Sequence, residues 1–217
     1  SIISMSFPSS GGILLGQMMK AIEKFDLSEI PHNSAEYIQL LTEIERRAFA
    51  DRSDLMGDPD FMNLPVYEFM DEEYIEDRMK SFSWEEATPS SEIKPGEVIF
   101  NESDETTHFS IIDKNGNAVS VTTTLNNSFG SKVYVENSGF FLNNEMDDFS
   151  SKPGFPNFFG VLGSEANSIQ PGKRMLSAMT PTIVLKNNKP KLILGSPGGP
   201  SIITVSYTHL RAHETRL

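Results

Sequence analysis

The segment 106–126 constrains the fold of this chain most strongly, because it holds two alternating stretches separated by an Asn-Gly pair. Polar and apolar side chains alternate in residues 108–113 and again in residues 118–126, and such alternation predicts β-strands. Asn115-Gly116 lies between them and is the pair most typical of a two-residue hairpin turn. The sequence therefore predicts a β-hairpin with these two residues at the centre of its turn.

Two threonine hydroxyls and an amide are expected at the open end of this hairpin. A two-residue turn makes Thr124 face Thr107 and lie diagonally beside Thr106, with Asn126 just beyond. Threonine also favours strands simply because it is β-branched. For Thr106 we favour a functional role over this structural one.

Thr106 is a candidate nucleophile. An unassisted threonine hydroxyl reacts poorly, but a threonine at a chain N-terminus is activated by its own α-amino group. That amine has an ordinary pKa of about 7.7–8, so a useful fraction is neutral near pH 7. Such a site requires the chain to be cut between Glu105 and Thr106.

Short motifs in a fixed order extend this interpretation along the chain. They are Pro8-Ser9-Ser10-Gly11-Gly12, Ala50-Asp51-Arg52-Ser53, Gly57-Asp58-Pro59-Asp60-Phe61, Thr106-Thr107-His108, Thr124-Leu125-Asn126, the run from Leu142 to Phe149, and Gly195-Ser196-Pro197-Gly198-Gly199. Together they closely resemble the γ-glutamyltransferase (γ-glutamyltranspeptidase) family of self-cleaving N-terminal-nucleophile hydrolases. The resemblance extends from about Ile2 to Thr204.

The resemblance implies an α+β fold, the αββα sandwich of N-terminal-nucleophile hydrolases, present here only in part. Residues 1–105 are then the helical C-terminal part of a large subunit with a linker, and residues 106–204 the N-terminal part of a small catalytic subunit. Relatives supply an arginine for the substrate α-carboxylate from a segment upstream of Ser1 and continue well beyond Gly199. We therefore expect the isolated chain to be inactive.

The implied activity is cleavage of the γ-glutamyl bond of glutathione and related amides through a threonine acyl-enzyme. Water or an amino-acid or peptide acceptor then receives the acyl group. The resemblance implies no metal or organic cofactor, association of the large and small subunits of one precursor, and a periplasmic or extracellular location.

The resemblance also assigns roles to individual residues. Thr106 is the nucleophile, Thr124 orients it, and Gly198 and Gly199 form the oxyanion hole. The protein side chains that bind the substrate α-ammonium are then Asn126, Glu145 and Asp148. Ser177 binds the α-carboxylate, and Phe159 belongs to the lid. Many relatives have Tyr at position 159 and a second Ser at position 178, where this chain has Phe159 and Ala178.

Two alternatives stay open. One is a related acylase that removes another side chain, such as a dicarboxylyl group from a β-lactam. Glu145 and Asp148 argue against it, because two carboxylates suit a substrate that carries an α-ammonium. The other is a non-catalytic secreted binding module that never cleaves itself.

Composition excludes several other classes. A net charge of −12 argues against nucleic acid and anionic membranes as partners. The absence of cysteine removes disulfides, thiol catalysis and cysteine-bound zinc. No apolar run approaches the roughly 18 residues of a membrane-spanning helix. Asp54, Asp58 and Asp60 lack the spacing of a calcium loop, so turn chemistry is the favoured explanation.

Residues 205–217 do not resemble the family. Their sequence matches the in-frame translation of a transposase sequencing adapter, so we expect them to have no specific packing role. His209 and His213 are four residues apart beside Glu214, but on this interpretation they form no metal site.

Helices are expected in the first hundred residues. Apolar periodicity predicts one over 12–25, a second starting after Asn33-Ser34, and a third over 71–82. The second should bury one face comprising Tyr37, Ile38, Leu41, Ile44 and Ala48. We expect loops at 51–65 and 150–172, an exposed linker at 88–96, and strands at 182–185 and 192–194 joined by an Asn-Asn turn.

Overall fold

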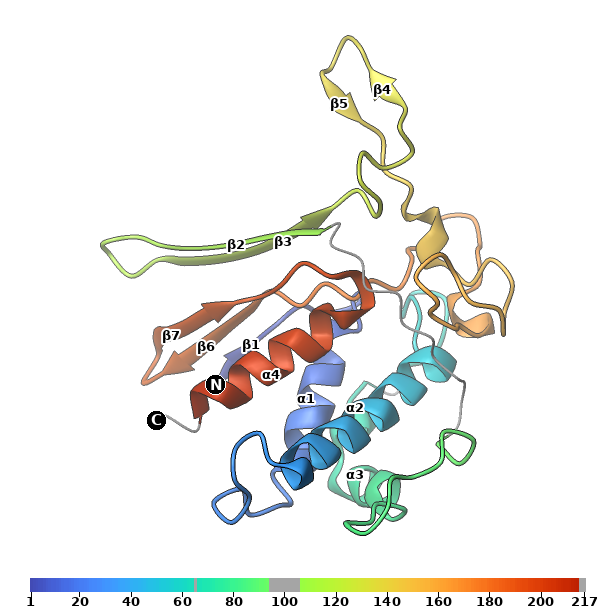
Figure 1. Ribbon diagram of the computed structural model, residues 1–217. Coiled ribbons are helices and arrows are strands. Elements are labelled where there is room, and N and C mark those ends of the chain that lie inside the picture. The colour runs from blue at the N-terminus through green and yellow to red at the C-terminus, as the bar shows by residue number, and fades with distance from the viewer. Residues whose placement is uncertain (65, 94–105, 215–217) are drawn as a thin grey trace.

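The computed structural model describes residues 1–64, 66–93 and 106–214 and arranges them in layers (Figure 1). The middle layer is an antiparallel sheet with the strand order β1-β6-β7, formed by Ile2–Ile3, Thr182–Lys186 and Lys189–Leu194. Helices lie below this sheet in the view of Figure 1, and a long hairpin lies above it. The mixture of helices and strands confirms the predicted α+β character.

The helical layer and one face of the sheet share a single apolar core. The described residues form four α-helices, α1 (Gly11–Ile22), α2 (Ala35–Leu55), α3 (Glu72–Met79) and α4 (Ile202–Glu214). Their buried side chains include Leu14, Leu15, Met18, Leu40, Ile44, Ile75, Ile203 and Tyr207, and the strand residues Val184, Leu192 and Leu194 pack against them. Among the described residues, no helix combines the length and apolar character needed to cross a bilayer.

The predicted helices all form, with shifted boundaries. The Ser34 side chain caps α2 by accepting a hydrogen bond from the Tyr37 amide at 3.1 Å, as its position before the helix predicted. The helix continues to Leu55, so the loop expected from residue 51 begins later. Ile38 is exposed and Leu40 is buried instead, because the buried face of α2 is rotated from the one expected.

Thr88 is not part of an exposed linker, contrary to expectation. Its amide donates to Glu43 Oε1 at 3.1 Å, its carbonyl accepts from Arg46 at 2.9 Å, and its hydroxyl accepts from Arg47 at 3.1 Å. Glu43 and Arg47 are themselves a buried ion pair on α2. The polar side chains of α2 therefore hold the chain at Thr88, while positions 94–96 of the expected linker lie outside the described residues.

The long hairpin joins β2 (Thr106–Ile112) to β3 (Ala118–Thr124), but its register differs by one residue from the predicted one. The Asp113 amide donates to the Asn117 carbonyl at 3.0 Å just beyond the two strands, so three residues remain in the loop between this pair. The Asp113 carboxylate accepts from the Asn115 and Asn117 amides at 2.8 and 2.9 Å, and Gly116 has a φ of +86°. An aspartate and a glycine at these positions favour a turn followed by a glycine bulge. Thr124 consequently faces Thr106 directly, and not Thr107.

The two faces of the hairpin differ in chemistry. His108 and Ser120 lie on the face that meets the central sheet, where Ser120 Oγ donates to the Leu194 carbonyl at 3.0 Å. Phe109, Ile111 and Val119 lie on the opposite face and are exposed. The hairpin thus presents polar side chains to the sheet and leaves apolar ones uncovered.

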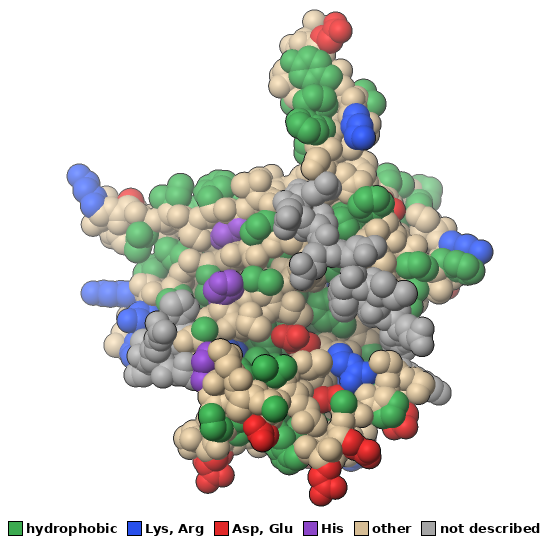
Figure 2. Space-filling model, viewed as in Figure 1, with side chains coloured by type: hydrophobic (Ala, Val, Ile, Leu, Met, Phe, Trp, Pro, Cys, Tyr) green, Lys and Arg blue, Asp and Glu red, His purple; other side chains and the backbone are tan. Residues whose placement is uncertain are grey.

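Two shorter hairpins complete the strands. The predicted Asn-Asn turn joins β6 to β7, and both Asn187 and Asn188 have positive φ angles, as a primed turn requires. β4 (Tyr134–Val135) and β5 (Phe140–Phe141) form a projecting arm (Figure 1). Apolar side chains line the arm on the face shown in Figure 2, and Tyr134 and Phe140 are about half exposed.

The expectation that residues 205–217 would not pack is wrong for the part that α4 contains. Tyr207 and Leu210 are almost fully buried, and the Tyr207 hydroxyl reaches the Met18 carbonyl of α1. These residues continue the helical spacing that begins at Ile203, so one apolar face of α4 covers α1.

Candidate active site

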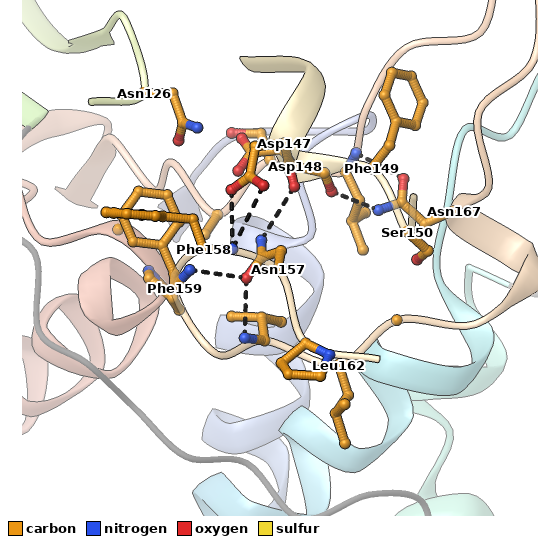
Figure 3. Close-up of a pocket in the computed structure, with 18 of the residues that line it drawn as sticks. Asn126, Asp147, Asp148, Phe149, Ser150, Asn157, Phe158, Phe159, Leu162 and Asn167 are labelled. Atoms are coloured by element: carbon orange, nitrogen blue, oxygen red, sulfur yellow. Dashed lines mark hydrogen bonds between the residues drawn. The ribbon is translucent and has the colours of Figure 1, made fainter. Parts of the chain in front are cut away.

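A cavity of about 480 Å³ opens at the end of the β2–β3 hairpin, between α2 and two loops (Figure 3). It is lined by most of the residues singled out from the sequence: Thr106, Thr124, Asn126, Asp148, Phe159, Ser177 and Gly199. Glu145 and Gly198 are not among the lining residues; Gly198 directly precedes the lining residue Gly199, and Glu145 shares a short helix with Asp147 and Asp148, which line the cavity. Glu105 lies outside the described residues.

Thr106 and Thr124 form a directly opposed pair at the mouth of the hairpin. Thr106 Oγ1 donates to Thr124 Oγ1 at 3.4 Å, which is long for a hydroxyl pair. The Asn126 amide donates to the same Thr124 oxygen at 2.9 Å. Thr107 points to the other side of the strand and is exposed, so the alternation of the strand selects Thr106 as the hydroxyl that borders the cavity.

Asn126 turns the chain out of the hairpin with a φ of +75°. Asparagine tolerates this left-handed conformation better than most residues. Its side-chain amide donates to the Asn144 carbonyl at 3.3 Å, and the Asn144 side chain accepts from the Asn127 amide at 3.0 Å. These contacts fix the end of β3 against the acidic turn that follows.

The two predicted carboxylates lie on one short 3₁₀ helix, η2 (Glu145–Asp148). Because such a helix has three residues per turn, side chains three apart point to the same side. Burial raises the pKa of Asp148 to about 7, while the charge of Arg52 opposes that rise. Burial also raises the pKa of Glu145. A cation entering the cavity would therefore favour the ionised form of Asp148.

Ser177 is held by the segment that precedes α1. Its carbonyl accepts from the Ser10 amide at 3.0 Å and from the side chains of Ser9 and Ser10 at 3.2 and 3.0 Å. The Ser177 hydroxyl accepts from the Met179 amide at 3.1 Å. Ser177 is buried and borders the cavity together with Ala178.

Gly198 and Gly199 have φ angles of +125° and +52°, which side chains other than hydrogen rarely permit. They begin a 3₁₀ turn, η4 (Gly199–Ser201), in which Ser201 Oγ donates back to the Gly198 carbonyl at 2.7 Å. At Gly199 the main chain therefore borders the cavity with no Cβ in between.

The loop 151–163 closes one side of the cavity around Asn157 (Figure 3). Asn157 Oδ1 accepts from the amides of Phe159 and Val161 at 3.1 and 3.0 Å, and its Nδ2 donates to the Asp147 carbonyl at 3.3 Å. The Asp147 carboxylate accepts from the Phe158 amide at 3.1 Å. Phe159 is buried as a result, with its ring 5.3 Å from that of Phe158.

Sequence reasoning missed the roles of Arg52, Asp147 and Asn157 in shaping this cavity. Arg52 lines it from α2 and is buried. Its only sequence signal is its place in the Ala50–Ser53 motif, and Asn157 is one of several turn-forming residues in its loop. Neither residue could be chosen without the tertiary contacts.

Asp58 forms a turn, as predicted. Its carboxylate accepts from the Asp60 amide at 3.2 Å and pairs with the Arg174 guanidinium at 2.5 Å. That pairing holds the pKa of Asp58 well below its usual range. Within the described part of the chain, no three His, Asp or Glu side chains are grouped so that they could bind a metal ion.

Comparisons with known proteins agree on one family. The gamma-glutamyltranspeptidase family model matches residues 1–213. A glutathione hydrolase proenzyme of Escherichia coli is 47% identical over 203 residues, which cover 94% of this chain and 35% of the relative. The Pseudomonas aeruginosa protein of the same name is 50% identical over 206 residues, covering 94% of this chain and 36% of the relative.

The fold is also found in a solved structure of low sequence identity. The cephalosporin acylase from Bacillus halodurans is 20% identical and superposes with a TM-score of 0.66, covering 90% of this chain and 31% of the acylase. The chain spans 35% and 36% of the length of the two glutathione hydrolase proenzymes, about a third of each.

Proposed function

Because the chain belongs to the gamma-glutamyltranspeptidase family, a family of enzymes, we propose that it carries the catalytic junction of a self-cleaving γ-glutamyltransferase. In this proposal residues 1–105 end the large subunit and residues 106–204 begin the small one. The donors are glutathione and related γ-glutamyl amides, and the acceptors are water or amino acids and peptides. The family resemblance also favours a periplasmic or extracellular location.

One observation supports this proposal above the others. The Thr106 hydroxyl meets Thr124 at 3.4 Å on the border of the same cavity that encloses Asp148. A nucleophile and a partly buried carboxyl that suits an ammonium group therefore border one cavity. A donor that carries both an acyl carbon and an α-ammonium fits such an arrangement.

Maturation begins with the Thr106 hydroxyl. Its oxygen attacks the carbonyl carbon of Glu105, the bond from that carbon to the Thr106 nitrogen breaks, and the hydroxyl proton passes to the nitrogen. This step frees the Thr106 α-amine and leaves an ester between Glu105 and the Thr106 oxygen. Water then hydrolyses the ester, which frees the Glu105 carboxylate and the Thr106 hydroxyl. Thr124 holds the attacking oxygen in place, and the free amine becomes the base for later turnovers.

Transfer follows the same chemistry on a different carbonyl. The Thr106 oxygen attacks the γ-glutamyl carbon, its proton passes through the α-amine to the leaving amine, and an ester to Thr106 remains. Water or an acceptor amine then attacks that ester. The main chain at Gly198 and Gly199 would stabilise the oxyanion at each step, a contribution that typically amounts to a factor of about 10²–10³ in rate per donor.

Donor recognition in this scheme comes from the far side of the cavity. Asn126, Glu145 and Asp148 hold the α-ammonium, and Ser177 holds the α-carboxylate. Phe159 closes the site by packing alone, because it has no hydroxyl. Its burial and its edge-to-face contact with Phe158 support that role.

The complete αββα sandwich belongs to this proposal as well. The described residues supply one helical layer, the central sheet and the hairpin above it. Phe109, Ile111 and Val119 leave the outer face of that hairpin apolar and exposed, which is the surface a second helical layer would cover.

N-terminal sequencing of a full-length protein containing this chain tests the assigned nucleophile. Two bands on a denaturing gel, with the smaller chain starting at Thr106, are the expected result. A start at Thr107 or Ser110 would rule out Thr106 as the nucleophile. A permanent single band would favour the non-catalytic binding module instead.

A comparison of two donors separates transferase from acylase. Gamma-glutamyl-p-nitroanilide carries an α-amino group and glutaryl-p-nitroanilide lacks it. We expect the first to be the far better substrate, because the partly buried Asp148 carboxyl lines the cavity and suits a cationic partner. A preference for the glutaryl compound would favour the acylase, a name that the structure from Bacillus halodurans carries.

A further inference from the structure

Arg52 is a buried cation on the border of the cavity. It lies on the last turn of α2 and is 7% exposed. Its guanidinium donates only to neutral acceptors in the hydrogen bonds found, to Ser10 Oγ at 2.9 Å and to the Leu176 carbonyl at 3.3 Å. None of the ion pairs among the described residues includes it. A buried charge that lacks an ion pair carries a large desolvation penalty, so its retention calls for an explanation.

Arg52 is connected to Ser177 by hydrogen bonds to the neighbouring main chain. Arg52 binds the carbonyl of Leu176, the residue before Ser177. It also donates to Ser10 Oγ, and that hydroxyl in turn donates to the Ser177 carbonyl at 3.0 Å. The guanidinium thus ties the start of α1 and the end of α2 to the strand of chain that presents Ser177. Removing it would leave two acceptors in this buried region without their donor.

Arg52 also interacts electrostatically with Asp148. Both side chains border the same cavity, and the positive charge of Arg52 lowers the pKa of Asp148 against the effect of burial. Glu145 and Asp147 on η2 act in the opposite direction. Lys152 borders the cavity too, but its ammonium lies over the Phe155 ring at 3.5 Å.

We infer that Arg52 is a positioning residue for donor binding, which fixes the main chain that presents Ser177 and supplies a positive charge on the border of the cavity that Asp148 also lines. This inference rests on the proposed function for the donor roles of Ser177 and Asp148. Arg52 itself is assigned no contact with the donor and no step of the reaction.

Carbon-13 NMR of the Asp148 carboxyl in the 217-residue chain tests the electrostatic half directly, without any need for turnover. Arg52→Met should raise the titration midpoint of Asp148 by about one pH unit, because an opposite charge nearby favours the ionised carboxylate. The Asp148 signal is identified by its loss in Asp148→Asn. Arg47→Met is the matched control, since Arg47 is equally buried on α2 but pairs with Glu43 away from the cavity.

An unchanged Asp148 midpoint in a folded Arg52→Met chain would refute this half of the inference. If Arg52→Met does not fold, Arg52→Lys and Ser10→Ala take its place. Arg52→Lys keeps the charge and should leave the midpoint within a few tenths of a pH unit. Ser10→Ala keeps the guanidinium and should leave the midpoint unchanged too, whereas a rise of about one pH unit in Arg52→Lys or Ser10→Ala would show that packing, and not charge, sets the midpoint.

Steady-state kinetics of a full-length protein containing this chain test the positioning half. Ser10→Ala and Arg52→Met should each raise KM for γ-glutamyl-p-nitroanilide about tenfold or more with kcat changed far less, since the acyl carbon and Thr106 are untouched. Only Arg52→Met should also move the acidic limb of the KM profile to higher pH. Wild-type KM in both variants would overturn the inference, while a wild type that turns over neither anilide would overturn the proposed function and leave the NMR result standing.

Discussion

Single residues determine the chemistry of this cavity through the main chain that carries them. Asn126 reaches its place because it adopts a φ of +75°, and Gly199 borders the cavity because it adopts +52°. Thr106 faces inward only because strand alternation sends Thr107 outward. Substitutions at these positions therefore test placement as well as side-chain chemistry.

At Thr106, hydroxyl chemistry and position can be separated by a series of variants in a full-length protein. Thr106→Ala should abolish chain cleavage and activity together, because both need the same oxygen. Thr106→Ser should retain slow cleavage and some turnover, since a primary hydroxyl remains beside the same amine. Thr124→Ala should fall between these, and the exposed Thr107→Ala serves as the control with near-normal cleavage. Gel densitometry over time measures chain cleavage in all four variants, and cleavage in Thr106→Ala would contradict the assignment of Thr106 as the nucleophile.

Asp148 should make the unliganded chain less stable as the pH rises. Its pKa in the fold is about 7, above the ordinary value of 3.8, so its folded state favours the protonated form. That contribution to stability is complete below about pH 4 and is lost as the pH rises through about 7. Asp148→Asn should therefore stabilise the chain by about 1–3 kcal/mol at pH 8 and much less at pH 4.

Urea unfolding of both chains at the two pH values gives the comparison. Burial also raises the pKa of Glu45 to about 7. The contribution of Glu45 to the pH dependence of stability is the same in both chains, so it cancels in the difference between wild type and variant. An equal effect of Asp148→Asn at pH 4 and pH 8 would show that the carboxyl titrates normally. The same titration should weaken binding of donors with an α-ammonium below about pH 7, because the protonated carboxyl no longer attracts a cation.

At the scale of elements, the sequence predicted which segments form strands and helices better than how they meet. The β2–β3 hairpin was expected from its Asn-Gly pair, but the Asp113 side chain favours a three-residue loop and shifts the register by one. That single shift places Thr124 opposite Thr106. A loop was expected at 150–172 from its composition, yet the order of its part 151–163 depends on Asn157, whose partners no periodicity reveals.

Asn157→Ala should loosen the loop 151–163 without unfolding the rest. Its side chain accepts from two amides, and losing hydrogen bonds at partly buried groups weakens a local structure by about 1–3 kcal/mol. The amides of Phe159 and Val161 should exchange with deuterium about tenfold faster or more. Hydrogen-exchange mass spectrometry measures this, with Asn137→Ala on the exposed β4–β5 arm as the control. Unchanged exchange at both amides would mean that Asn157 does not organise the loop.

At the scale of the whole molecule, one core joins segments from both ends of the chain. Periodicity predicted the helices α1 and α2, but sequence alone could not show that α4 covers α1, because the two lie almost two hundred residues apart. Arg52 was hidden for the same reason, since its partners at Ser10 and Leu176 become neighbours only in the fold. Long-range contacts thus account for most of what the sequence analysis missed.

Tyr207→Ala should destabilise the chain by about 3–5 kcal/mol, because Tyr207 is fully buried between α4 and α1. Thr208→Ala, on the exposed side of the same helix, should change stability by less than about 0.5 kcal/mol. Equilibrium urea unfolding of the 217-residue chain gives both values. Equal stability of the two variants would restore the expectation that this part of the chain has no packing role.

The pairing of β1 with β6 determines the order in which the chain must fold and be cut. Strand β1 lies before residue 105 and β6 after it, and the helices of both segments share their core. A cut between Glu105 and Thr106 would convert one folding unit into two chains, each with half of a core. Folding of the uncut chain is a first-order process, whereas reassembly of the cut pair is second-order and fails on dilution. The chain would therefore have to fold before it is cut, and a matured protein that loses its structure would recover it in a yield set by its concentration.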